Sequence, residues 1–178
     1  SALIRQALQS GKHVLCEKSI TLNIKELNEA AALARKRHLV LAEAMTIYHM
    51  PLFKQLKALI NKGELGRLRT IQLNFGSRKE YDPASRFYNP ALGGGALLDI
   101  GVYALSFARW FMTSVPDQIQ SQVRMTASGV DDQSGILLKN PQGEMATIAL
   151  TFQAKQPKRG VAAFEWGYIE VEEYPRAD

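Results

Sequence analysis

The protein has 178 residues, 46% hydrophobic and 22% charged, with a formal net charge of +5, which is the composition of a folded globular protein. Its positive residues are scattered, with no basic stripe interleaved with aromatic residues, so nucleic-acid binding is not expected. No apolar run approaches the ~20 residues that a membrane span needs, so no membrane partner is expected either.

The first part of the chain alternates helix and strand. Asn23 is placed to cap the second helix, with Glu26 as the third residue of a capping box. Helices and strands at this spacing indicate consecutive units of a parallel sheet. Such a sheet should begin with a strand, but the chain begins inside a helix at Ser1, so the first strands of a larger sheet are expected upstream. The predicted elements are a helix, a strand, a helix and a strand at residues 2–10, 13–16, 23–37 and 39–43.

From about residue 46 the pattern changes to helices followed by long strands. Strands that succeed one another across short turns predict a mostly antiparallel sheet with helices on one face. A tight turn is predicted at 140–143, Asn-Pro-Gln-Gly. The predicted helices are 51–62 and 95–112, and the predicted strands are 67–77, 118–127, 133–140, 144–154 and 161–172.

Glu17 and Lys18 directly follow the first predicted strand. Ligands of open parallel sheets bind outside the carboxyl ends of the strands, so Lys18 stands where a cofactor would lie. The alternative is a solvated lysine at a strand end. Position alone does not decide between these two interpretations.

The glycine-rich segment 93–103, Gly-Gly-Gly-Ala-Leu-Leu-Asp-Ile-Gly-Val-Tyr, is the richest in candidate functional groups. Three glycines before a helix permit close approach of the backbone to a ligand. Asp99 and Tyr103 are four residues apart and therefore share one helical face. The alternative is a capped core helix whose tyrosine hydroxyl bonds to the aspartate.

The remaining motifs and residue types give no sign of a phosphate-binding loop, a metal site or a reactive cysteine. The chain contains no Gly-x-Gly-x-x-Gly dinucleotide fingerprint and no Walker-type phosphate loop. The three histidines lack ligand spacing, so no metal is expected; His13 is interpreted as structural and His49 as a candidate substrate contact. The single cysteine, Cys16, is interpreted as a small core residue and favours a reducing, cytoplasmic location.

Together these segments resemble the glucose–fructose oxidoreductase, inositol dehydrogenase and rhizopine catabolism (Gfo/Idh/MocA) family. Residues 11–18, Gly-Lys-His-Val-Leu-Cys-Glu-Lys, look like the family's Gly-Lys-His-Val-Leu-Cys-Glu-Lys-Pro signature. Residues 93–103 look like its Gly-Gly-Gly-x-Leu-x-Asp-x-Gly-x-His/Tyr helix, and residues 129–133 and 167–169 match recurrent segments of its second domain. The resemblance covers nearly the whole chain.

The resemblance implies an α/β protein of two parts. Residues 1–45 would be the C-terminal part of a Rossmann domain that binds NAD or NADP. Residues 46–178 would be an α+β domain for substrate binding and dimerisation, with an open, mostly antiparallel sheet, incomplete at its C-terminus. The implied partners are a small sugar-like substrate and a second copy of the chain, in a homodimer or higher homo-oligomer that forms through the open sheet.

The resemblance also assigns site residues. Glu17 and Lys18 would lie at the cofactor, with Lys18 near both nicotinamide and substrate, and Asp99 and Tyr103 take the two helix positions. Tyr103 stands where many members have histidine, and a tyrosine at this position resembles the glucose–fructose oxidoreductase and dihydrodiol dehydrogenase branches. Ser19 replaces the family proline, which leaves the backbone geometry after Lys18 open.

These roles suggest an NAD(P)-dependent dehydrogenase acting on a secondary alcohol of a sugar, polyol or cyclic diol. Tyrosine has a reference pKa of about 10, and a nearby ammonium favours the tyrosinate. Tyr103 would then act as acid and base, with Lys18 as the tuning cation and Asp99 holding Lys18 or a substrate hydroxyl. Tyr48, His49 and Arg86, with the loop 81–89, would select the substrate.

Two alternatives remain from the sequence. The 178 residues could be an inactive fragment without its nucleotide-binding motif, or a non-catalytic sugar-binding relative. Loss of Lys18, or of both Asp99 and Tyr103, would favour the second alternative, and all three residues are present.

Overall fold

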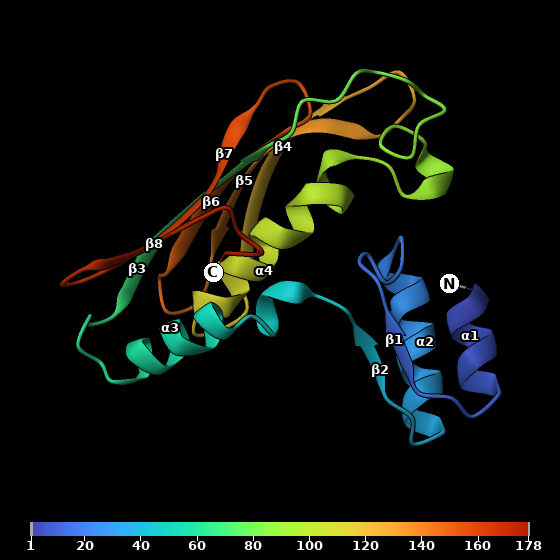
Figure 1. The fold of residues 1–178 in the computed structure, drawn as a ribbon, viewed down its shortest axis with the longest axis horizontal. Helices are drawn as coiled ribbons and strands as arrows, with labels where there is room; N and C mark the ends of the chain where they lie inside the picture. Colours follow the sequence, from blue (N-terminus) through green and yellow to red (C-terminus); the bar gives the residue numbers. More distant parts are fainter. Residues whose placement is uncertain (1, 178) are drawn as a thin grey trace. The chain divides into compact units, whose positions relative to one another are not determined.

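The structure is a computed structural model that describes residues 2–177, and Figure 1 shows its helices and strands. The chain divides into two compact units, Ser1–Met45 and Thr46–Asp178. The first alternates helix and strand, and the second contains a six-stranded sheet. This is the α/β class that the sequence predicts.

The first unit consists of two helices and two parallel strands. Its strands pair with Leu15 opposite Ala42, and a helix connects them, as in one unit of a parallel sheet. The predicted cap of the second helix is present, because Asn23 Oδ1 accepts the Glu26 backbone N–H at 2.9 Å. The Glu26 carboxylate accepts a hydrogen bond from the Asn23 side-chain amide rather than from the Asn23 backbone N–H. The elements are α1 (Ala2–Gln9), β1 (Val14–Cys16), α2 (Ile24–Lys36) and β2 (Leu41–Glu43).

A small core holds the first unit together. Ile4 and Leu8 lie one turn apart on α1 and are 6% and 0% exposed, and Ala34 of α2 packs in the same cluster. Cys16 of β1 lies partly buried against this cluster, whereas Leu15 points to the opposite face of the strand and is 74% exposed. The strand end that carries Glu17 and Lys18 is therefore held by a packed scaffold.

The second unit is built on the six-stranded sheet that Figure 1 labels β3 to β8. Its strand order is β4-β5-β6-β3-β7-β8. The central β3–β6 pair is parallel, and the other four pairs are antiparallel. The strands are β3 (Leu68–Gly76), β4 (Gln118–Met125), β5 (Asp131–Lys139), β6 (Met145–Thr151), β7 (Gln156–Phe164) and β8 (Tyr168–Glu172). The helices are η1 (Thr46–Tyr48), α3 (Pro51–Asn61), η2 (Pro90–Leu92), η3 (Leu97–Gly101) and α4 (Val102–Phe111).

Helix α4 covers one face of this sheet and forms the core of the unit. The Phe107 ring meets Phe53 of α3 edge to face, with centroids 5.8 Å apart. It also lies over Gly160 of β7, where an added Cβ would come within 2.6 Å of the ring. The helix and the sheet therefore approach closely. The buried apolar side chains of α4 recur every three or four residues, as an amphipathic helix requires, at Ala104, Phe107, Ala108 and Phe111.

The opposite face of the sheet is open. Side chains alternate between the two faces of a strand, and register places Leu137, Thr147, Gln72, Val161 and Glu170 in one row across five strands. The members of this row on β6, β3 and β8 are exposed. The row consists mainly of apolar and uncharged polar side chains.

The long helix predicted from about residue 95 to 112 is two helices of different kinds. Leu97–Gly101 is a π-helix, and α4 begins at Val102. The sequence could not predict the wider turn, because apolar spacing does not distinguish a π-helical turn from an α-helical one. Such turns are frequent at functional sites, and this one contains Asp99.

The single strand predicted over residues 161–172 is a hairpin. β7 and β8 are joined by a tight turn in which the Phe164 N–H donates to the Gly167 carbonyl at 2.8 Å. The sequence did not predict this turn, because aromatic residues, which favour strands, lie in and beside it. Glu165 fixes the turn to the start of β3, because its Oε2 accepts the Arg67 N–H at 3.0 Å.

One helical stretch has the length and hydropathy of a membrane span, contrary to the expectation from the sequence. Pro90–Phe111 has 22 residues and contains an 18-residue window with a mean hydropathy of 1.5. Its apolar runs are short and are separated by glycines and Asp99, so the sequence did not reveal it as one segment. Half of its apolar window is buried within the protein, and α4 supplies the core residues of that part.

Candidate active site

Lys18 lies in a turn that ties together the ends of the two parallel strands. Glu17 and Lys18 follow β1 directly. The Glu43 carboxylate at the end of β2 accepts the Ile20 N–H at 2.9 Å. The peptide bond between Lys18 and Ser19, the position where the sequence left the backbone geometry open, is cis. The hydrogen bond between Ile20 and Glu43 attaches the turn that carries Lys18 to the end of β2.

The glycine-rich loop packs closely against the protein itself. An added Cβ at Gly94 would lie 2.9 Å from backbone atoms of Asn89 and Phe87. Gly95 has a φ of +113°, and its Cβ would lie 2.5 Å from Asp131 Oδ1. The close approach that the sequence suggested for a ligand is thus made by neighbouring segments of this chain.

Asp131 caps the helix that carries the candidate residues. Its Oδ2 accepts the Leu97 N–H at 2.9 Å and the Ser134 hydroxyl at 3.0 Å. This carboxylate stands at the positive end of the helix and is stabilised there. Sequence reasoning missed this role, because the residue lies 34 positions away from its partner.

Replacing Asp131 with alanine is expected to lower the free energy of unfolding by about 1 kcal/mol, the usual cost of losing a helix cap. Urea denaturation followed by circular dichroism measures the loss. Asp117→Ala is the matched control, because Asp117 is exposed and such surface changes cost less than about 0.5 kcal/mol. Equal losses in the two variants would contradict the capping role.

The structure brings together Arg86 and Asp99, two of the predicted site residues. Arg86 Nη1 lies 3.3 Å from Asp99 Oδ1, with the two side chains 64% and 14% exposed. A pair this exposed contributes at most about 1 kcal/mol to stability. Asp99 lies on the π-helical turn, and the ion pair directs its carboxylate toward the loop that precedes the glycines.

Tyr103 packs on a residue that sequence reasoning missed. Its ring stacks against Phe75, with centroids 6.3 Å apart and planes inclined by 25°. Phe75 lies near the end of β3, is 6% exposed and meets Tyr174 edge to face at 5.9 Å. The alternation of buried residues along β3 was the available signal, since it places Phe75 on the helix-covered face. Phe75 therefore sets the plane of the Tyr103 ring.

Tyr48 and His49 lie toward the other end of α4. The Tyr48 ring contacts Trp110, with centroids 5.6 Å apart. Trp110 is seven residues beyond Tyr103, which is two turns or about 10 Å along the same helical face. His49 is exposed, and its backbone N–H closes the η1 turn on Thr46. Tyr48 thus shares a face of α4 with Tyr103, while His49 faces solvent.

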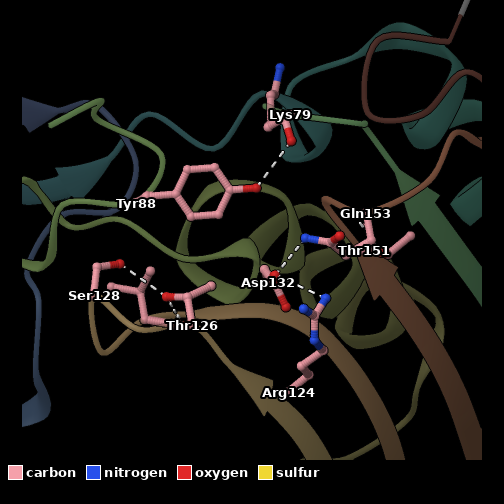
Figure 2. Close-up of polar contacts among 9 residues, drawn as sticks. Lys79, Tyr88, Arg124, Thr126, Ser128, Asp132, Thr151 and Gln153 are labelled. Carbon is pink, nitrogen blue, oxygen red and sulfur yellow. Dashed lines mark hydrogen bonds and ion pairs between the residues drawn. The ribbon is translucent and has the colours of Figure 1, made fainter. Parts of the chain in front are cut away.

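Two other tyrosines are held as hydrogen-bond donors. The Tyr88 hydroxyl donates to the Lys79 carbonyl at 3.2 Å (Figure 2). Burial, followed by the nearby charge of Asp132, raises the pKa of Tyr88. Burial also raises the pKa of Tyr174. Neither phenol is therefore suited to act as a base near neutral pH.

A polar network fixes the strand segment beside Asp131. Asp132 accepts a bond from Gln153 Nε2 at 2.6 Å and pairs with Arg124 at 3.3 Å (Figure 2). The Thr126 and Ser128 hydroxyls bond to each other at 3.0 Å in the adjoining turn. A hydrogen bond and an ion pair therefore hold the start of β5, the segment that includes the capping residue Asp131.

The described histidine with a side-chain hydrogen bond has a structural role. His13 Nδ1 accepts the Val40 N–H at 2.9 Å, which confirms its structural role. Among residues 2–177, no three histidine, cysteine, aspartate or glutamate side chains are grouped so that they could hold a metal ion.

Family models cover most of the chain. Residues 1–45 match a model described as an oxidoreductase family with an NAD-binding Rossmann fold. Residues 53–170 match the GFO/IDH/MocA C-terminal domain. The first match coincides with the first structural unit, and the second match lies within the second unit.

Curated relatives with significant similarity include trans-1,2-dihydrobenzene-1,2-diol dehydrogenases. The Homo sapiens protein is 38% identical over 156 residues, which are 85% of this chain and 46% of that protein. The Xenopus tropicalis protein is 29% identical over 170 residues, 95% of this chain and 51% of that protein. The chain thus spans about half the length of these relatives.

Solved structures show the same architecture. An aldose–aldose oxidoreductase from Caulobacter crescentus, in complex with glycerol, superposes with a TM-score of 0.89 at 25% identity, covering 99% of this chain and 53% of that chain. A 3-ketoreductase from Actinomadura kijaniata, in complex with NADP and TDP-benzene, gives a TM-score of 0.84 at 27% identity, covering 97% and 53%.

Proposed function

Because the chain belongs to the Gfo/Idh/MocA family of oxidoreductases, we propose that the full-length protein transfers a hydride between NAD or NADP and a secondary alcohol of a sugar, polyol or cyclic diol. One observation carries the proposal: the chain retains the lysine of the first family motif at a strand end and the Asp99–Tyr103 pair of the second on a helix. The dihydrodiol dehydrogenase relatives and the aldose and NADP-bound neighbours support this substrate and cofactor class.

The residues fit the reactive end of such a cofactor. The 178 residues contain no Gly-x-Gly-x-x-Gly loop, so Glu17 and Lys18 are the cofactor contacts that the chain offers. They stand at the carboxyl edge of parallel strands, where dinucleotides bind in open sheets. When bound, NAD(P) supplies the hydride acceptor.

The protein must then handle the proton of the alcohol. In this proposal Tyr103 takes that proton as the hydride leaves carbon, and the Lys18 ammonium stabilises the tyrosinate and binds the reacting hydroxyl. Asp99, held by Arg86, orients a substrate hydroxyl or Lys18. Arg86 contacts the substrate beside Asp99, and Tyr48 and His49 contribute to substrate selection from the other end of α4.

The test is an absorbance assay at 340 nm on the full-length protein, with NAD or NADP and a panel of aldoses, inositol and a cyclic trans-diol. Lys18→Met is expected to lower kcat by about 100-fold, the scale of losing one positioned electrostatic or proton-transfer group. Lys12→Met is the control, because Lys12 is an exposed lysine of the same segment and should leave kcat unchanged. Equal kcat values in both variants would remove Lys18 from the mechanism.

We also propose that the protein forms a homodimer through the open face of the sheet, in the reducing cytoplasm that its single free cysteine suits. Thr147 is exposed and lies on β6, one of the two central strands of that face. Thr147→Arg is expected to place a like charge against its own copy and to convert dimers to monomers in sedimentation equilibrium. A mass that stays dimeric in this variant would place the interface elsewhere.

A further inference from the structure

Two cationic side chains pack against the ring of Phe87, which lies in the loop before the glycines. Lys79 Nζ lies 4.3 Å from the ring centroid, and Arg86 Cζ lies 4.1 Å from it. The two charges are therefore no more than about 8.4 Å apart, the sum of the two distances. That separation is close to the Debye length at physiological ionic strength, so salt screens their repulsion incompletely.

Only part of this positive charge is neutralised within the described residues. Asp99 pairs with Arg86 through Nη1 at 3.3 Å. No carboxylate among residues 2–177 lies within 4 Å of Lys79 Nζ. A guanidinium has five N–H donors, and the Arg86 side chain, which is 64% exposed, uses one of them on a described acceptor. Glu80 and Asp82 of the same loop are exposed and form no ion pair with either cation. The Lys79 and Arg86 head groups therefore keep N–H donors that no described carboxylate uses.

The backbone that carries these cations is anchored. The Lys79 N–H donates to the Phe152 carbonyl at 2.8 Å, and the Gly95 N–H donates to the Phe87 carbonyl at 2.8 Å. The Tyr88 hydroxyl bonds to the Lys79 carbonyl (Figure 2). A site whose groups are held before the ligand arrives loses less freedom on binding.

We propose that Lys79 and Arg86 form a subsite for an oxyanion of the substrate, which is accordingly a sugar or cyclic alcohol bearing a carboxylate or a phosphate. The forked donors of arginine match both groups, and a lysine ammonium adds a point charge. Asp99 connects the subsite to the π-helical turn four residues before Tyr103. That spacing suits a ring whose alcohol reacts at one end and whose anionic group is held at the other. The inference rests on the proposed function for the identity of the reacting ring.

The experiment separates binding from turnover, and it uses the full-length protein saturated with NADP. Calorimetry with D-glucose, D-glucuronate and D-glucose 6-phosphate compares ligands that differ at one exocyclic carbon. We expect at least one of the two anions to bind at least ten-fold more tightly than D-glucose, and the better anion distinguishes a carboxylate from a phosphate subsite. Lys79→Met is expected to reduce that preference at least five-fold. Arg78→Met, a change at the neighbouring exposed cation, should leave it intact.

Each outcome decides one of the two proposals. Equal affinity for the three ligands, or an anion preference that Lys79→Met leaves unchanged, overturns the subsite whether or not the enzyme turns over. A Lys79→Met variant that weakens NADP binding instead of sugar binding also overturns it, because the cations would then serve the cofactor. Anion binding without any hydride transfer across the substrate panel supports the subsite and contradicts the proposed function.

Discussion

Tyr103→Phe is expected to lower kcat of the full-length enzyme by about 100-fold or more, the range assigned to a positioned general acid–base group. The substitution removes the hydroxyl and keeps the ring that stacks on Phe75, so the helix should retain its packing. Under the proposed mechanism the lost group acts while hydride transfer occurs. kcat and kcat/KM should therefore fall together, with little change in KM.

The control for this prediction is Tyr168→Phe. Tyr168 is 66% exposed on β8, so the same atom is lost outside the candidate site. Steady-state kinetics with the best substrate of the panel, and thermal unfolding of both variants, provide the measurements. A Tyr103→Phe enzyme that keeps kcat within about three-fold of the parent would show that another group, or water, carries the proton.

Local rules predicted the parts of the fold that depend on neighbouring residues. The cap of α2 follows from Asn23 and Glu26, three positions apart, and the structure confirms it. The turn at Asn140–Gly143 is confirmed in the same way, with the Gly143 N–H donating to the Asn140 carbonyl at 2.9 Å. These interactions close within a few residues, so a linear pattern is sufficient to identify them.

The features that sequence reasoning missed depend on contacts between distant segments. Asp131 reaches Leu97 only because β5 is placed beside the start of the helix, and Phe75 reaches Tyr103 only because α4 crosses β3. The glycines were interpreted as room for a ligand, but Asp131 occupies the space beside Gly95. Spacing within one element could identify Asp99 and Tyr103, but not the groups that orient them.

The largest expected loss of stability concerns Phe107. Phe107→Ala should lower the free energy of unfolding by about 3–5 kcal/mol, the range for deleting a buried aromatic ring. The ring is fully buried, and its centroid lies 4.7 Å from that of Phe111 and 5.3 Å from that of Tyr174. Below it, Gly160 has no side chain that could fill the vacated space. The cavity can therefore collapse only by moving α4, which argues for the upper part of the range.

Trp166→Ala provides the comparison that separates burial from ring size. Trp166 has the larger ring but is 75% exposed at the β7–β8 turn, so its removal should cost less than about 1 kcal/mol. Urea denaturation followed by far-ultraviolet circular dichroism measures both variants. Because Phe107 lies one turn beyond Tyr103 on α4, its loss should also loosen the Tyr103 ring and lower kcat in the fraction that remains folded. Similar losses of stability in the two variants would show that α4 is not packed on the sheet as closely as the Phe107–Gly160 contact requires.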